Sequence, residues 1–259
     1  MTIQIKSTKD LKAKDNGVKL LIYGESGMGK TVLSSTAKDV LVVSAESGLL
    51  SLSKNNLLTI HPNDPIVKAN ATNGIKVIEI QQPAAYTYEN ADQPLQQLRD
   101  IYQFLASPQA KDIKTVVIDS ISEISEIVLA CMIGKTKDDR QAYKDLRNKM
   151  IAIVRNYRDL PKNIVFIAKQ NTEKNDNGAI IKVTPAMAGK KLGEDVAYQL
   201  DCVFYMKNVS NDQGQLCRVL ATRPDSNFCE YIAKTRNSSL PIYVNPHLEQ
   251  IFEMINKGE

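Results

Sequence analysis

The chain has few of the residues that build metal sites or disulfide frameworks. It contains two histidines, His61 and His247, and no CxxC pair among its four cysteines, Cys131, Cys202, Cys217 and Cys229. Structural zinc sites and disulfide-rich secreted scaffolds need such residues in clusters. We therefore expect neither a zinc site nor a disulfide framework, and we interpret the cysteines as buried free thiols of a reducing compartment.

Long hydrophobic runs and domain linkers are also missing. Residues 1–16 are polar and lysine-rich with no apolar signal core, and no run approaches the roughly 20 residues of a membrane span. With 259 residues and 43% hydrophobic content, the chain is long enough for one sizeable core. We expect a soluble cytoplasmic protein without a membrane partner, made of an N-terminal segment (1–17) and one domain (18–259).

The N-terminal segment contains a short alternating pattern, Thr2–Lys6. Alternation of this kind predicts a strand. It would pair either with the sheet of its own subunit or with the sheet edge of a neighbouring subunit.

The strongest motif is a phosphate-binding loop. Residues 24–31 (GESGMGKT) match the pattern GxxxxGK[ST] between the apolar run Val18–Tyr23 and a predicted helix over Thr31–Lys38. Glycines let consecutive N–H groups of such a loop turn toward an anion, while its lysine reaches the β- and γ-phosphates and its threonine ligates Mg²⁺. The motif predicts an ATPase that uses ATP and Mg²⁺, with Lys30 as a catalytic residue. The expected nucleotide-binding residues are Gly24, Gly27, Met28, Gly29, Lys30, Thr31 and Val32.

Apolar strands alternate with helical patterns along the rest of the chain. This alternation predicts an α/β fold with a mostly parallel central sheet flanked by helices. The polar stretch Lys169–Lys191 is expected to be a surface loop, folded into a hairpin around Asn177 and Gly178. Further helices are expected over Pro94–Leu105, Ile121–Ile133 and Asp139–Arg158, and further strands over Val40–Ser44, Val77–Ile80, Ile113–Ile118, Ile164–Ala168, Val203–Met206, Leu216–Thr222 and Tyr231–Ala233.

Two carboxylates follow strands that should end beside the phosphate loop. Ligands of parallel α/β sheets bind beyond the carboxyl ends of the strands. Asp119 ends an apolar strand and is predicted to hold Mg²⁺ together with Thr31; alternatively it caps the next helix. Glu46 follows the neighbouring strand and is predicted to activate the attacking water; alternatively it is a surface residue in a turn.

The positive charge of the chain is concentrated in one region. Residues 134–191 contain fourteen Lys or Arg against six Asp or Glu, a net charge of +8, although the whole chain carries only +4. Such asymmetry indicates a polyanionic partner, unless these residues form solvated helix faces.

The order of these motifs resembles the core of the RecA recombinase family. The phosphate loop comes first, then a strand ending in Ala-Glu, a strand ending in Val-Ile-Asp-Ser, the strand Val165–Ala168 with a polar loop, and finally Tyr198–Asp201. Over Val18–Pro241 the chain is similar to the phage-encoded, single-core RecA-like ATPases, some of which are single-strand annealing recombinases of the Sak group. The resemblance implies the cytoplasm of a bacterial host.

The resemblance also implies roles for particular residues. Glu46 takes the place of the catalytic glutamate and Asp119 that of the magnesium-linked aspartate. Lys169 or Gln170 falls at the position of the γ-phosphate sensor. Lys234 and Arg236 resemble the basic pair that RecA-like proteins insert onto the ATP of a neighbouring subunit. The residues after Glu46 lack the Asp and the aromatic residue that hold adenine in RecA proteins, so adenine specificity is not predicted.

The same resemblance places two DNA-binding loops near 134–140 and 171–191. We predict contacts with phosphates of single-stranded DNA, a steep salt dependence and little sequence preference, because the second loop contains no aromatic residue. Self-association into a filament or ring is expected, and a single-strand-binding protein is a further expected partner. A helicase motor and a regulatory NTPase without nucleic acid are the alternative functions. The predicted DNA-binding residues are Lys135, Lys137, Arg140, Lys174, Lys182, Lys190 and Lys191.

Overall fold

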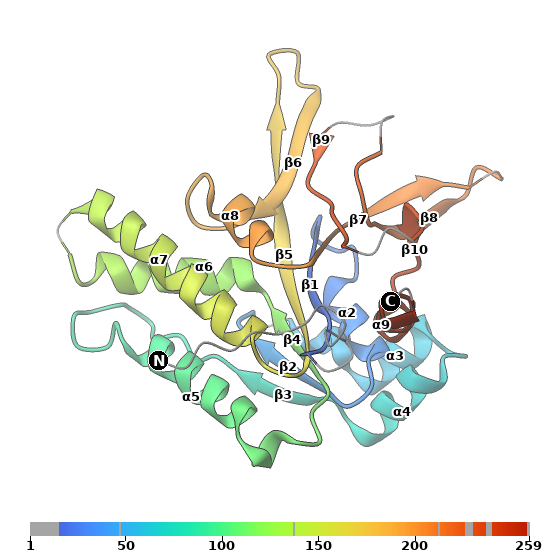
Figure 1. The fold of residues 1–259 in the computed structure, drawn as a ribbon, viewed down its shortest axis with the longest axis horizontal. Coiled ribbons are helices and arrows are strands. Elements are labelled where there is room, and N and C mark those ends of the chain that lie inside the picture. Colours follow the sequence, from blue (N-terminus) through green and yellow to red (C-terminus); the bar gives the residue numbers. More distant parts are fainter. Residues whose placement is uncertain are drawn as a thin grey trace, which may run out of the picture.

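The computed structural model describes residues 16–46, 48–136, 138–211, 213–225, 230–236 and 240–257. The expected strand Thr2–Lys6 lies outside these residues, as do Lys137 and Cys229. The described residues form one central sheet with helices on both faces (Figure 1). Its strands are β1 (Lys19–Gly24), β2 (Val40–Ser44), β3 (Lys76–Glu79), β4 (Thr115–Asp119), β5 (Asn163–Lys174), β6 (Ile180–Ala186), β7 (Cys202–Ser210), β8 (Leu216–Ala221), β9 (Glu230–Tyr231) and β10 (Tyr243–Val244).

The strands follow the spatial order β10-β8-β7-β1-β5-β4-β2-β3, and β6 pairs with β5 and β9. From β7 to β3 all pairings are parallel, whereas β8, β10 and β6 are added to the sheet in antiparallel orientation. The predicted α/β fold with a mostly parallel sheet is therefore confirmed. Because the parallel strands point the same way, β1, β2 and β4 end at one edge of the sheet with Gly24, Ser44 and Asp119, and β5 passes this edge at Lys169.

The central strands are apolar because both faces of the sheet are covered. In β1, Leu21 and Tyr23 belong to one core, whereas Leu20 and Ile22 belong to the other. Helices α5 (Gln93–Ala106), α6 (Ile121–Ile133), α7 (Asp139–Arg158) and α8 (Leu192–Tyr198) cover the first face. The second face is covered by α2 (Lys30–Leu33) and α9 (Leu248–Lys257), with α3 (Lys54–Ile60) and α4 (Pro65–Asn73) beside them.

Two long helices have the bounds that the sequence predicts. Helix α6 begins after Ser120, whose Oγ accepts a hydrogen bond from the backbone N–H of Glu123 (3.2 Å). Helix α7 begins after Asp138, whose carboxylate accepts from the N–H of Arg140 (2.9 Å). These side chains satisfy N–H groups that have no partner within the helix.

The helix predicted over Thr31–Lys38 is longer than the helix in the structure, so the prediction is wrong in its length. Helix α2 ends at Leu33 and continues as a 3₁₀ turn, η2 (Ser34–Thr36). The hydroxyls of Ser34, Ser35 and Thr36 each donate to the carbonyl three residues earlier, at 2.6–2.7 Å. Such local bonds compete with regular helical pairing, which explains the early end.

The stretch predicted as a polar surface loop is a paired hairpin for most of its length. Strand β5 continues to Lys174, turns at 175–179 and returns as β6, so the hairpin expected at Asn177 and Gly178 is confirmed. At the turn, Asn175 Oδ1 accepts from two backbone N–H groups and Gly178 has a positive φ of 78°. The hairpin projects beyond the rest of the sheet (Figure 1).

Several shorter elements have no counterpart among the sequence predictions. These are α3, α4, α8, α9, β10 and the 3₁₀ turns η3 (Leu49–Leu52) and η4 (Pro108–Ala110). Cys131 and Cys202 are buried free thiols as expected, but Cys217 is exposed on β8. Within the described ranges, no helix combines the length and the hydrophobicity that a membrane-spanning segment requires.

Candidate active site

The phosphate loop connects β1 to α2 at the carboxyl edge of the sheet. Gly27 and Gly29 have positive φ values of 76° and 81°, which residues with a Cβ rarely adopt. The ammonium group of Lys30 donates to the carbonyls of Gly24 (2.8 Å) and Glu25 (2.6 Å). Burial lowers the pKa of Lys30, although the carboxylates of Asp119 and Glu46 oppose this effect. The lysine is thus held over the loop, in reach of an anion that binds there.

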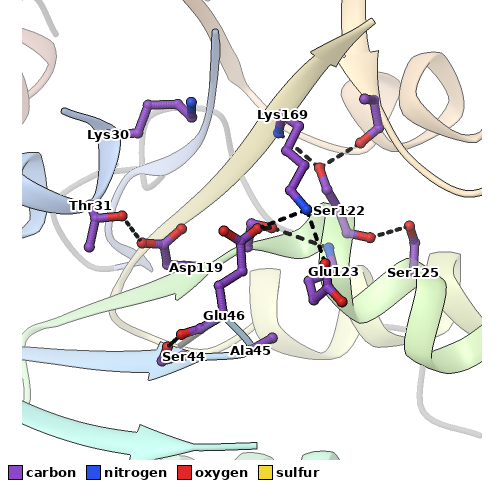
Figure 2. Close-up of polar contacts among 12 residues, drawn as sticks. Lys30, Thr31, Ser44, Ala45, Glu46, Asp119, Ser122, Glu123, Ser125 and Lys169 are labelled. Atoms are coloured by element: carbon purple, nitrogen blue, oxygen red, sulfur yellow. Dashed lines mark hydrogen bonds and ion pairs between the residues drawn. The ribbon is translucent and has the colours of Figure 1, made fainter. Parts of the chain in front are cut away.

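Thr31 and Asp119 lie side by side below the loop. Thr31 Oγ1 donates to Asp119 Oδ2 at 2.5 Å (Figure 2). Burial raises the pKa of Asp119, although the hydrogen bond from Thr31 lowers it. Because Ser120 caps α6, the alternative role of Asp119 as the cap of that helix is wrong. A hydroxyl and a carboxylate are hard oxygen ligands of the kind that Mg²⁺ takes together with phosphates, so the pair fits this ion.

Glu46 extends toward the same site from the end of β2. Its carboxylate accepts a hydrogen bond from Ser120 Oγ (2.5 Å) and lies 3.3 Å from Lys169 Nζ. Figure 2 shows Glu46 beside Asp119 rather than turned away from it. Its position therefore favours the predicted role over that of a surface turn residue.

Lys169 and Gln170 lie where β5 passes the phosphate loop. Lys169 forms ion pairs with Glu46 (3.3 Å) and Glu123 (3.0 Å). Burial alone would lower the pKa of Lys169, but its bonds to these carboxylates raise it. Gln170 Nε2 donates to Glu25 Oε1 of the loop (3.2 Å). Both candidate sensors thus contact the site, Lys169 at Glu46 and Gln170 at Glu25 of the loop.

These residues surround a cleft of about 730 Å³. Gly27, Gly29 and Val32 line it as predicted. Gly24 and Met28, also predicted to bind the nucleotide, do not line the cleft, and the side chain of Met28 is buried in the core. The cleft is lined by Glu25, Ser26, Gly27, Gly29, Lys30, Thr31, Val32, Glu46, Gly48, Ser51, Ile60, Asp119, Ser120, Ile167, Lys169, Gln170, Thr172 and Arg218.

Residues 16–237 match the model of the AAA-domain family. The chain belongs to this family. It is a P-loop ATPase domain, as the phosphate loop, the Thr31–Asp119 pair and the parallel sheet indicate. A KaiC-like protein from the hyperthermophilic archaeon Pyrococcus horikoshii OT3 is a similar solved structure, with 16% identity, a TM-score of 0.46 and 82% of each chain covered. A search of curated proteins finds no match.

In this AAA domain, Lys234 and Arg236 lie far from the phosphate loop of their own chain. Lys234 is paired with Val203, near the amino end of β7, and Arg236 forms an ion pair with Asp201 (2.9 Å). Gly24 is level with Met206, which is three residues beyond Val203 and five beyond Asp201, or about 10 Å and about 17 Å at about 3.3 Å per residue. Lys234 Nζ lies 5.8 Å from the centre of the Tyr198 ring. Burial, followed by the charge of Arg236, lowers the pKa of Lys234.

The predicted DNA-binding residues fall into two groups. Lys135 and Lys182 are engaged within the chain, because Lys135 forms an ion pair with Asp92 and Lys182 with Glu194 (2.8 Å). The other described candidates are exposed: Arg140 on α7, Lys174 at the hairpin tip, and Lys190 and Lys191 before α8. The connection between α6 and α7 and the tip of the β5–β6 hairpin form separate projections (Figure 1). One chain therefore presents these residues at more than one place.

Arg218 of β8 is a cleft residue that the sequence does not reveal. It lies almost 190 positions beyond the phosphate loop, as the one charged residue of an otherwise apolar strand with no motif. Only the pairing of β8 with β7, and of β7 with β1, brings it to the loop. No local sequence pattern carries this information.

Proposed function

We propose that this ATPase binds single-stranded DNA and acts as an ATP-dependent annealing or recombination protein, assembled as a ring or filament. One observation carries the proposal: strand β5 runs without a break from the cleft to the projecting hairpin. Ile167, Lys169, Gln170 and Thr172 line the cleft, and Lys174 ends the same strand. A change at the phosphate end of the cleft therefore has a direct route to the surface that we assign to DNA.

The chemistry follows from the position of Glu46. A carboxylate beside the magnesium-binding pair is placed to orient an attacking water and to accept its proton. Lys169 and Ser120 both hold this carboxylate, so its position depends on β5 and on the start of α6. Mg²⁺, when bound through Thr31 and Asp119, supplies charge neutralisation for the phosphates.

Lys234 and Arg236 make hydrolysis depend on assembly in this proposal. Negative charge develops on the transferred phosphoryl group, and a cation supplied by a neighbouring subunit stabilises it. The distance of both residues from their own phosphate loop supports a role on the nucleotide of a neighbour. Hydrolysis in such an arrangement depends on subunit contact.

The DNA part of the proposal rests on charge and on the shape of the hairpin. Residues 134–191 carry a net charge of +8. Four predicted DNA-binding residues of this region are exposed and make no ion pair within the described residues: Arg140 on α7, Lys174 at the hairpin tip, and Lys190 and Lys191 before α8. Contacts of lysine and arginine with phosphates release counterions, so affinity should fall steeply with salt.

The direct test compares hydrolysis of ATP with and without single-stranded oligonucleotides, and measures DNA binding by fluorescence anisotropy at two salt concentrations. A variant in which Lys174, Lys190 and Lys191 are all changed to Ala should lose most of the binding. The control Lys111→Ala removes an exposed lysine that follows η4 and precedes β4, at the opposite edge of the sheet, and should bind like the wild type. Absence of binding and of stimulation in the wild type at low salt would favour the regulatory NTPase.

Product assays separate the two DNA-related functions. Faster annealing of complementary oligonucleotides, or ATP-dependent filaments or rings seen by electron microscopy, would support the proposal. Unwinding of a tailed duplex without annealing would favour the helicase motor instead.

A further inference from the structure

The hairpin formed by β7 and β8 brings a cation to the phosphate loop from the chain itself. A Cβ built on Gly29 would lie only 2.6 Å from Nη1 of Arg218. The hairpin is fixed there, because Asn208, the cross-strand neighbour of Arg218, contacts Sδ of Met28 (3.8 Å). The adjoining residues Val219 and Leu220 are buried. Arg218 is thus an exposed side chain on an anchored strand, and its guanidinium lies against the loop.

Arg218 has no carboxylate partner among the described residues, although it shares the cleft with Glu25, Glu46 and Asp119. Its guanidinium makes no ion pair with any residue that the structure describes. Lys169, by contrast, forms ion pairs with both Glu46 and Glu123. The positive charge of Arg218 also reaches His61, where it contributes to a lowered pKa after the larger effect of burial. An unpaired guanidinium beside the backbone N–H groups of a phosphate loop is suited to bind an anion.

We infer that Arg218 binds the α- and β-phosphates of the nucleotide held by its own chain. The order of the strands indicates which phosphates. Strand β8 lies on one side of β1, whereas β4 and β2, which position Asp119 and Glu46, lie on the other side. The magnesium-binding pair and the catalytic carboxylate mark the γ-phosphate end. Arg218 therefore meets the other end of the polyphosphate, and its planar fork can contact two oxygens at once.

This role differs from that of Lys234 and Arg236. Those residues are proposed to act on a neighbour's nucleotide and on the step of hydrolysis. Arg218 is proposed to act on the nucleotide of its own chain, and on nucleotide binding rather than on hydrolysis. The inference rests on nucleotide binding at the cleft, as the proposed function does, but it does not depend on DNA.

The test compares Arg218→Ala and Arg218→Lys with the wild type. Affinities for ADP and for a non-hydrolysable ATP analogue are measured by isothermal titration calorimetry in the presence of Mg²⁺. Loss of a charge-assisted contact predicts roughly tenfold or greater weakening for Arg218→Ala, equal for both nucleotides. Arg218→Lys should recover part of the affinity, because it keeps the charge and loses the two-pronged contact. The control Arg99→Ala removes an exposed arginine of α5 and should bind normally.

Mixed assemblies distinguish action within a chain from action on a neighbour. Adding an excess of Lys30→Ala subunits, which keep Arg218, should not restore nucleotide affinity to Arg218→Ala subunits. Unchanged affinity in Arg218→Ala, a loss for the ATP analogue alone, or rescue by the added subunits would overturn the inference. If the wild type binds nucleotide but not DNA, the proposed function fails and the role of Arg218 stands.

Discussion

Replacement of Gly193 by Ala tests how firmly the β5–β6 hairpin is attached to the rest of the domain. Gly193 is the second residue of α8 and packs against the backbone of Pro185 in β6. A Cβ at this position would lie 1.9 Å from the carbonyl oxygen of Pro185 and 2.9 Å from its carbonyl carbon. Pro185 cannot easily retreat, because it is paired with Gln170 of β5. The helix has to move instead.

The magnitude follows from the size of that movement. Nonbonded heavy atoms separate to about 3.5 Å, so α8 must withdraw from β6 by about 1.5 Å. The helix buries Leu192, Val196 and Ala197 in the main core, and a gap of 0.5–1 Å already forfeits a quarter to a half of the dispersion energy of each contact. Together with the overpacking itself, we expect a loss of about 3 to 5 kcal/mol in the free energy of unfolding.

Equilibrium urea denaturation measures this loss, and two other glycines serve as controls. Gly178→Ala places a Cβ in open space at a φ of 78°, so it isolates backbone strain and should cost about 1 to 2 kcal/mol. Gly134→Ala meets neighbours at 3.5 Å or more without a positive φ and should change stability by less than about 0.5 kcal/mol. A cost for Gly193→Ala no larger than that for Gly178→Ala would refute the packing argument.

Three further predictions concern the site and the second face of the sheet. Lys30→Ala should abolish ATP turnover, because the cation over the loop is lost; a steady-state phosphate assay with residual turnover near wild type would contradict its role. Arg236→Ala should leave nucleotide binding largely intact but eliminate hydrolysis in the assembled state, and equal loss of both, measured by calorimetry and phosphate release, would argue against action on a neighbour. Burial alone would raise the pKa of Asp64, but two N–H groups of α4 and His247 (2.8 Å) hold it below 3.8. The stabilisation that Asp64 provides is therefore present above pH 3.8 and is lost as the pH falls through the lowered value. Asp64→Asn should remove this pH dependence and keep most of the cap, whereas Asp64→Ala should cost about 1 kcal/mol more. If the free energy of unfolding, measured by denaturation, falls equally with acid in the wild type and in Asp64→Asn, the assignment is contradicted.

Where local chemistry decides an element, the sequence predicts it well. The bounds of α6 and α7 follow from capping residues, Ser120 and Asp138, in front of apolar periodicity. The phosphate loop, Asp119 and Glu46 follow from motifs at the ends of buried strands. Each of these signals lies within a few residues of the feature that it predicts.

Features that depend on distant parts of the chain escape such reasoning. The outer half of β5 is polar because it is a ribbon exposed to solvent, so it has no apolar run by which a strand would be recognised. Helix α9 did carry a signal, since Leu248, Ile251, Phe252 and Ile255 share one face. Arg218 carried none, because the pairing of β8 with β7 alone brings it to the loop.

The positions of the cations indicate that one chain binds the nucleotide and that a neighbouring chain contributes to its hydrolysis. Lys30 and Arg218 line the cleft of their own chain, whereas Lys234 is level with Leu21 in the middle of β1 and Arg236 is paired with Asp201, just before β7. A single subunit can therefore hold a nucleotide with its own cations, but within the described residues it brings no arginine to Glu46. If hydrolysis requires such a cation at the γ-phosphate, an isolated subunit is a binding protein and the assembly is the enzyme. The rate of hydrolysis per subunit should then rise with protein concentration, whereas nucleotide affinity should not.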